Sequence, residues 1–226
     1  MRIAGVDLSL RATGVAVAST ATATSAVVEC WKPKERGTER LAWLRSQVER
    51  LVEQHRPDLV VLEAYAFSRH DAYAHELGEA GGVVRLALAD ADVPWCTVAP
   101  TSLKKYATGK GNASKEQVLV EAVRRLGYDG HDNNEADALW LAAMAVDHYG
   151  GPCHVPQSHR AGLGKVQWAP ARLVHVLATD DEQPCPDCAG HGFGARSLGG
   201  GGISTSTCRS CGGSGAAVEA EGETDG

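Results

Sequence analysis

The order of apolar runs in the first part of the chain limits the folds that it can adopt. Three short strand-like runs come first, at residues 3–7, 14–18 and 27–31, with a polar turn between the first two. A helical pattern then covers residues 38–55, where Leu and Val recur at three- and four-residue spacing. Successive strands with short connections predict an antiparallel start, before the first helix allows a parallel crossover.

The next stretch alternates helix and strand. Pro57 ends the first helix, and residues 59–62 form a continuous apolar run, as expected of a strand covered on both faces. A helix over residues 73–91 and a strand over 94–98 follow, and the last helix of this half is expected over 133–148. The pattern predicts an α/β fold and fits a ribonuclease H-like mixed five-stranded sheet flanked by helices, although the same order could begin other mixed α/β folds.

Composition divides the chain into four parts. Residues 1–150 form the predicted α/β domain, and residues 151–184, punctuated by Pro, Gly and His, form a predicted extension or linker. Residues 185–215 are rich in Gly and hold four Cys, which indicates a small separate module. Residues 216–226 are acidic with almost no large apolar residue, so we expect this tail to be disordered.

Length and charge exclude several classes of protein. The 226 residues carry a net charge of −6, which argues against a non-specific nucleic-acid binder but not against a local basic patch. No apolar run approaches the roughly 18 residues of a membrane span, and the N-terminal stretch contains Asp7 where a signal peptide is apolar. We therefore expect a cytoplasmic protein with no membrane partner, whose Cys residues are thiols or metal ligands rather than disulfides.

Two acidic residues end predicted strands. Asp7 follows the first apolar run and Glu63 follows the run at 59–62. Charge is costly inside an apolar strand, so both side chains should project from the carboxyl ends, where α/β sheets bind ligands. If the two strands are parallel neighbours, the carboxylates lie roughly 5 Å apart and repel each other. A hard divalent cation, Mg²⁺ or Mn²⁺, removes that conflict.

The last predicted helix adds a third acid, Asp137. Asn134 lies three residues earlier on the same helical face. Asp132 and Glu135 have the spacing of a capping box, which favours a structural role for both. Two strand ends and one helix start can together assemble a two-metal phosphodiester site, with Asp7, Glu63, Asn134 and Asp137 as the candidate ligands.

A basic segment follows the predicted strand at 94–98. Lys115 stands at a helix start, where a cation opposes the helix dipole unless an anion is bound nearby, and a flexible Gly-Lys-Gly turn precedes it. This favours phosphate binding over a merely solvated charged face. Aromatic and basic residues after Glu63 could stack on or contact DNA, although a core or lid role is the alternative. The candidate DNA-binding residues are Lys104, Lys105, Lys110, Lys115, Tyr65, Phe67 and Arg69.

With these residues placed, the chain resembles the RuvC family of Holliday junction resolvases, and most of all its bacteriophage-encoded members. The matching motifs occur in family order and spacing over about residues 1–150. They are Gly5-Val6-Asp7-Leu8-Ser9 with Thr13-Gly14, Leu62-Glu63, Leu77 to Gly82, Lys104 to Lys115, and Glu135-Ala136-Asp137-Ala138-Leu139.

The resemblance implies a homodimer that binds four-way DNA junctions and cleaves them by Mg²⁺- or Mn²⁺-dependent hydrolysis with two ions, in a host cytoplasm if phage-encoded. It implies that Asp7, Glu63 and Asp137 are catalytic metal ligands and that Lys104 and Lys115 contact DNA. We also expect Lys115 to offset charge on the phosphate under attack. The family usually has Asp or His three positions before its last acid. This chain has Asn134 there, so Asn134, Asp132 or Glu135 would supply the fourth ligand.

The four Cys of residues 185–215 form two copies of C-x-x-C-x-G-x-G, separated by 19 residues. Each hairpin presents two thiolates, and two hairpins complete a tetrahedral site. The sequence therefore predicts a structural Zn²⁺ bound by Cys185, Cys188, Cys208 and Cys211, with redox or disulfide use as the alternative. The spacing resembles the zinc module of J-domain chaperones.

Two other functions remain open at this stage. The Gly5–Ser9 motif with Thr13-Gly14 also resembles the first phosphate loop of actin and sugar-kinase ATPases, a class that needs two such domains where residues 1–150 supply one. The chain could also be a junction-binding protein that has lost nuclease activity at Asn134. Cleavage of a four-way junction distinguishes the three.

Overall fold

The computed structural model describes residues 1–21, 27–65, 74–170, 193–198 and 202–207. The chain divides into two compact units, Met1–Ala178 and Thr179–Gly226. Among the described helices, none is both long enough and apolar enough to cross a lipid bilayer.

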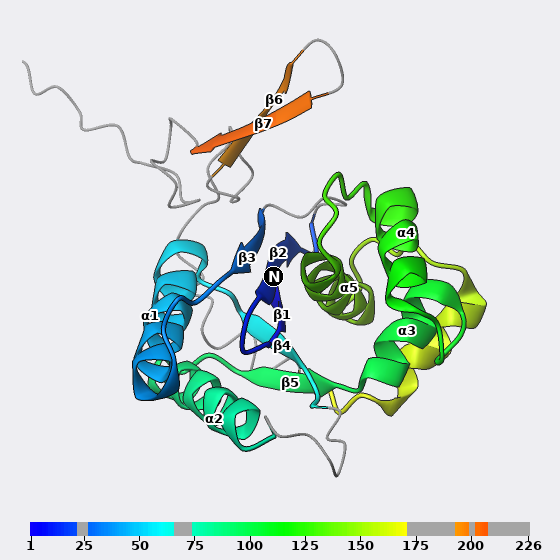
Figure 1. Ribbon diagram of the computed structural model, residues 1–226. Helices are drawn as coiled ribbons and strands as arrows, with labels where there is room; N and C mark the ends of the chain where they lie inside the picture. Colours follow the sequence, from blue (N-terminus) through cyan, green and yellow to red (C-terminus); the bar gives the residue numbers. More distant parts are fainter. Residues whose placement is uncertain (22–26, 66–73, 171–192, 199–201, 208–226) are drawn as a thin grey trace, which may run out of the picture. The chain divides into compact units, whose positions relative to one another are not determined.

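The first unit is built on a five-stranded mixed sheet with the order β3-β2-β1-β4-β5 (Figure 1). The antiparallel pairs β1–β2 and β2–β3 form one side, and β4 and β5 continue the sheet parallel to β1. This confirms the predicted antiparallel start joined to parallel strands. The strands are β1 (Arg2–Asp7), β2 (Thr13–Ser19), β3 (Val27–Trp31), β4 (Leu59–Glu63) and β5 (Trp95–Val98).

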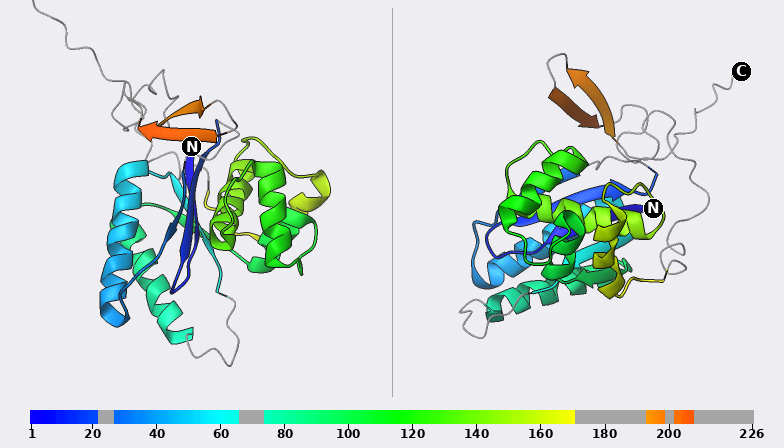
Figure 2. Two further views of the ribbon diagram at one scale, coloured as in Figure 1. Left: turned by 45° about the horizontal axis from the view of Figure 1, so that its top comes forward. Right: turned by 90° about the vertical axis from the view of Figure 1, so that its right-hand side faces the viewer.

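Helices cover both faces of this sheet (Figure 2, left). One layer contains α1 and α2, and the other contains α5 with α3 and α4 beside it. Each layer has its own apolar core, one built on Ala4, Val6 and α1, the other on Ile3, Val61 and α5. The helices are α1 (Gly37–His55), α2 (Ala74–Asp90), α3 (Pro100–Thr108), α4 (Lys115–Leu126), α5 (Asn133–His148) and the 3₁₀ helix η1 (Gln157–Lys165).

Two glycines allow α5 to lie directly on the sheet. A Cβ at Gly5 on β1 would lie 2.1 Å from the carbonyl oxygen of Ala138, and one at Gly14 on β2 would lie 1.9 Å from that of Asn134. Only a residue without a side chain permits this approach. The Gly5 and Gly14 motifs therefore set the height of α5 above the sheet.

Helix α3 is absent from the sequence-based prediction, which treated residues 100–115 only as a basic segment. Pro100 at its first position is a typical helix-start residue, and Gly109 caps its end with φ of 82°. Helix α4 begins at Lys115 as predicted, and a Ser114–Gln117 capping box satisfies its first amides.

In the second unit, β6 (Phe193–Leu198) and β7 (Gly202–Thr207) pair antiparallel as a hairpin. This hairpin lies between the two C-x-x-C pairs in the sequence. Cys185, Cys188, Cys208 and Cys211 lie outside the described residues.

Candidate active site

The strand register brings Asp7 and Glu63 together. Val6 of β1 pairs with Leu62 of β4, so the acid that follows each lies at the same end of neighbouring parallel strands. Side chains alternate across a strand, and Ile3 and Leu59 already face the α5 layer. Asp7 and Glu63 fall on that face too, and they share a side-chain hydrogen bond.

Asp137 joins them from the first turns of α5. It stands one residue before Ala138, whose carbonyl lies against Gly5 of β1. Asp137 is 7% exposed and Asp7 is 6% exposed, so both carboxylates are buried among apolar neighbours. The three predicted acids therefore converge, although β1, β4 and α5 stand at the start, in the middle and at the end of the α/β domain's sequence.

Burial raises the pKa of all three acids, and repulsion by the Asp7 charge adds to the shift at Glu63 and Asp137. For Asp7 the main cause is desolvation, partly offset by the hydrogen bond from Glu63. Desolvation and the Asp7 charge raise the pKa of Glu63 to about 9, and the same two causes raise that of Asp137 to about 7. The Lys115 ammonium opposes these shifts at each acid. The cluster of Asp7, Glu63 and Asp137 (the acid cluster) thus carries more negative charge than the nearby lysines compensate.

This donor set fits hard divalent cations. Carboxylate oxygens are the protein ligands that Mg²⁺ and Mn²⁺ prefer, and clustered acids with raised pKa values gain most from a bound cation. The shared hydrogen bond between Asp7 and Glu63 requires a proton, which a cation would displace.

Asp132 and Glu135 point to other partners. Asp132 caps α5 by accepting the Asn134 amide at 2.8 Å, as predicted, but Glu135 does not complete a capping box. Instead Glu135 accepts a hydrogen bond from the hydroxyl of buried Tyr128 at 2.6 Å, and the same hydroxyl oxygen accepts the Asp132 amide that a capping box would leave to Glu135. That part of the capping-box prediction is wrong.

The same two acids form a cluster with Cys30. Their ligand atoms and the Cys30 sulfur lie within 4.8 Å of one another. Desolvation and the Asp132 charge raise the pKa of the Cys30 thiol to about 11, which keeps it protonated. The Lys32 ammonium nitrogen lies 3.8 Å from a carboxylate oxygen of Asp132. Because Asp132 and Glu135 already have donors, they are less suited than Asn134 to complete a metal site with Asp7.

Two of the predicted DNA-contacting lysines lie near the acids. The charges of Lys115 and Lys104 both lower the pKa of Asp137. Lys115 is exposed at the first position of α4, and Lys104 is half-buried on α3. Helices α3 and α4 therefore each place a cation near the acid cluster.

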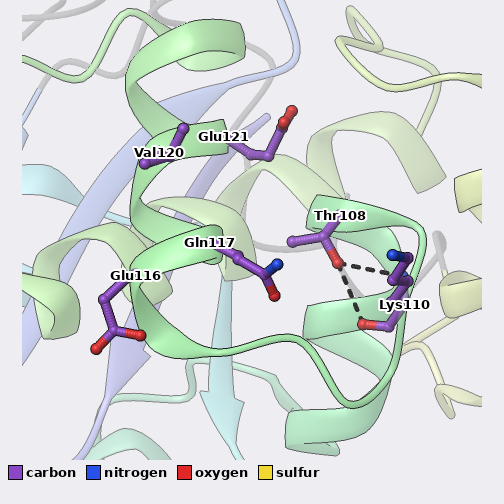
Figure 3. A pocket seen from close by; sticks show the side chains of 6 residues that line it. All are labelled: Thr108, Lys110, Glu116, Gln117, Val120 and Glu121. Carbon is purple, nitrogen blue, oxygen red and sulfur yellow. Dashed lines mark hydrogen bonds between the residues drawn. The ribbon is translucent and has the colours of Figure 1, made fainter.

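The loop between these helices is more ordered than a free Gly-Lys-Gly turn. The Lys105 ammonium donates to the Gly109 carbonyl at 2.6 Å, which ties this lysine to the end of α3. The Lys110 amide donates to Thr108 Oγ1 at 3.1 Å, and the Thr108 hydroxyl also lies 3.1 Å from the Lys110 carbonyl oxygen (Figure 3). The Lys110 amide is therefore already occupied, which contradicts our expectation that the amides of this turn can approach a phosphate. Its side chain remains exposed beside a hollow, which is lined by Thr108, Lys110, Glu116, Gln117, Val120 and Glu121.

Tyr65 packs against α2. A Cβ at Gly81 would lie 1.3 Å from the Tyr65 hydroxyl oxygen, and the Arg85 guanidinium carbon lies 5.3 Å from the ring centroid. This contact supports the core alternative for Tyr65, while base stacking stays a prediction. Phe67 and Arg69 lie outside the described residues.

Comparison with known proteins agrees with this geometry. Residues 3–148 match the family model described as crossover junction endodeoxyribonuclease RuvC. The RuvC of Ruegeria pomeroyi is 34% identical over 151 residues, which cover 66% of this chain and 90% of that protein. The RuvC of Pelotomaculum thermopropionicum is 31% identical over 155 residues, covering 66% and 94%.

Solved structures give the same result. The Thermus thermophilus RuvC structure superposes with a TM-score of 0.57 at 26% identity, covering 74% of this chain and 98% of that one. The same protein in complex with a Holliday junction substrate gives a TM-score of 0.57 at 28% identity, covering 72% and 97%. With the model match extending over more than half of its length, this chain belongs to the RuvC family of crossover junction endodeoxyribonucleases.

Proposed function

We propose that this protein is a Mg²⁺-dependent resolvase that cleaves four-way DNA junctions as a homodimer, in recombination and repair. The observation that carries the proposal is the convergence of Asp7, Glu63 and Asp137 in one largely buried acid cluster beside Lys104 and Lys115. The complex of the T. thermophilus relative with a Holliday junction supports branched DNA as the substrate. A bacteriophage origin, suggested by the motif resemblance, stays part of the proposal.

Each residue then has a defined role. Asp7, Glu63 and Asp137 would hold the divalent ions, which when bound supply a low-pKa water nucleophile and positive charge beside the scissile phosphate. Lys115 places its ammonium within electrostatic range of all three acids. A cation there offsets charge that develops on the phosphate during attack. Lys104, Lys105 and Lys110 would meet neighbouring backbone phosphates, and Tyr65, Phe67 and Arg69, which follow Glu63 in the sequence, stay candidate DNA contacts.

Asn134 is our choice for the fourth ligand. Its competitors on α5, Asp132 and Glu135, already accept hydrogen bonds from the Asn134 amide and the Tyr128 hydroxyl. Asn134 lies three residues before Asp137, on the same helical face. Its amide oxygen can coordinate Mg²⁺ but brings no charge, so the second ion would bind more weakly than beside Asp.

The test is cleavage of a synthetic four-way junction with Mg²⁺, beside a matched duplex and a flap. We expect paired cuts in the junction that need the cation, with little cutting of the other two substrates. Tight Mg²⁺-independent binding without cleavage would instead identify a junction-binding protein, and ATP hydrolysis would favour the kinase-like alternative.

We also propose that the four Cys of the second unit hold a structural Zn²⁺. The pairing of Phe193 with Thr207 supports this, because those positions stand five residues after Cys188 and one before Cys208. A hairpin between two C-x-x-C pairs brings the two chain segments that lead to these pairs to within about one strand spacing of each other. Thiol titration with and without a chelator tests it: four protected thiols are expected, and none protected would end the proposal.

A further inference from the structure

The 3₁₀ helix η1 lies beyond the residues that match the family model, and it rests directly on α3. Gly162 of η1 is buried. A Cβ there would lie 2.6 Å from the Ser102 carbonyl oxygen and 3.0 Å from the Tyr106 nitrogen. The backbones of η1 and α3 are therefore in contact, with no side chain between them at this point.

Two side chains of η1 fix this contact. His159 Nδ1 lies 3.1 Å from the Tyr106 carbonyl oxygen, and a Cβ at Gly109 would lie 2.8 Å from His159 Nε2. His159 thus covers the end of α3. Arg160 donates through Nε at 3.0 Å and Nη2 at 2.5 Å to the buried carboxylate of Asp147 on α5. The 3₁₀ helix is therefore tied to α3 and α5.

Helix α3 carries side chains of two kinds. Ser102 and Tyr106 are buried and face η1, whereas Lys104 is half-buried and close enough to the acids to affect Asp137. A short helix moves as a rigid body, so a displacement at the η1 contact would also displace Lys104. It would move the Gly109–Lys110 loop as well, because His159 sits against Gly109.

We infer that η1 is a positioning element for DNA binding: its contacts with α3 and α5 hold Lys104 and the Gly109–Lys110 loop where they meet junction phosphates. Gly162, His159 and Arg160 act through α3 and α5 rather than on the DNA. The inference deepens the proposed function and rests on it. It also assigns a role in binding to residues beyond the family-matched region 3–148.

A matched pair of glycine substitutions tests this. Gly162→Ala forces η1 away from α3, whereas Gly164→Ala makes the same change in the same element with nothing within 4 Å of the new Cβ. The dissociation constant for a four-way junction is measured in EDTA over a salt series. We expect Gly164→Ala to match the wild type. Gly162→Ala should bind several-fold more weakly. The slope of the logarithm of its binding constant against the logarithm of salt concentration should be smaller in magnitude by about one, as for a lost phosphate contact.

The design separates positioning from stability. A variant that is merely less stable binds with a lower active fraction but unchanged affinity and slope. Combining Gly162→Ala with Lys104→Ala should be less than additive, because both act on one contact. His159→Ala, which removes a smaller contact, should shift affinity in the same direction and decides the matter if Gly162→Ala does not fold.

Wild-type affinity and slope in both Gly162→Ala and His159→Ala would overturn the inference and leave the proposed function intact. A wild-type protein that binds no junction would overturn the proposed function, and this inference with it.

Discussion

Helix α5 carries two buried acids, Asp137 and Asp147, whose surroundings are opposite in kind. Asp147 accepts the Tyr106 hydroxyl at 3.1 Å and a bidentate Arg160 guanidinium. Asp137 instead faces the like charge of Asp7, and its pKa rises to about 7. The two acids stand ten residues apart on one helix. The Asp147 carboxylate is compensated by hydrogen-bond donors, whereas the Asp137 carboxylate repels the acids beside it.

The difference separates a structural acid from one that we propose to be functional. A buried carboxylate with donors aimed at it ties elements together, here α5, α3 and η1. Buried carboxylates that face each other destabilise the protein until a cation binds, so they persist where function requires them. Changes at the two ends of α5 should therefore affect different properties.

The largest effect is expected at the uncompensated end. Asp7→Asn removes a ligand charge worth several kcal/mol in the transition state, so cleavage should fall by roughly 10³-fold or more. Junction binding should persist, because the lysines are unchanged. Single-turnover cleavage and a binding titration measure the two, and cutting at the wild-type rate would refute the site.

The same substitution should leave the metal-free protein as stable as the wild type or more stable. An Asn at this position can still accept the Glu63 hydrogen bond through its side-chain oxygen, and it removes one of the repelling charges. Thermal melting in EDTA checks this, and a large loss of stability would place Asp7 in the same class as Asp147.

The opposite result is expected at the compensated end. Arg160→Ala leaves the Asp147 side chain, which is 1% exposed, with Tyr106 as its only donor among the described contacts. We expect a loss of about 3 kcal/mol in unfolding free energy, at the low end for buried pairs because Arg160 is 38% exposed. Urea denaturation measures it. Arg124→Ala, which breaks an ion pair in which Arg124 is 72% exposed, is the control and should cost at most about 1 kcal/mol.

The acid cluster should also make the folding stability of the metal-free protein depend on pH in a distinctive way. The folded-state pKa values of Glu63, about 9, and Asp137, about 7, lie above their ordinary values. The folded protein therefore holds protons that the unfolded chain loses near pH 4, so stability falls as pH rises from about 4 to about 9. Mg²⁺ added at pH 8 should restore stability by binding only the folded state.

The reference for this titration is Asp137→Asn. This variant lacks one of the raised groups, so its stability should fall less steeply between about pH 4 and pH 7. Melting temperatures across the range, in EDTA and in Mg²⁺, provide the measurement. Identical pH profiles for variant and wild type would contradict the repulsion attributed to Asp137.

Sequence reasoning located the acids because their signals are local. Asp7 and Glu63 each follow an apolar strand, and the antiparallel-then-parallel order follows from the connection lengths. Sequence reasoning did not explain how α5 reaches the sheet. Gly5 and Gly14 are needed because a Cβ at either position would collide with the backbone of α5, more than 100 residues away in the sequence. It missed α3, whose Lys-rich sequence resembles a charged loop.

The partners of individual side chains were the least predictable part. Asp132 and Glu135 have capping-box spacing, but Tyr128 takes the Glu135 carboxylate. Lys105 and Lys110 looked equivalent, yet one is tied to Gly109 and the other is exposed. Spacing along the chain determines which residues share a face, whereas tertiary packing decides which donor reaches which acceptor.

The smallest effect is expected from adding a charge to the acid cluster, which tests whether the uncompensated end of α5 binds a cation. Asn134→Asp places a fourth carboxylate on the α5 face of Asp137. It should lower the Mg²⁺ concentration that half-saturates cleavage several-fold, while slightly destabilising the metal-free protein. Asn133→Asp adds the same charge in the same helical turn, about 100° away, so it controls for the helix dipole and for net charge. Equal shifts in both variants would mean that the α5 terminus responds to charge in general, whereas a shift in Asn134→Asp alone would identify residue 134 as a ligand position.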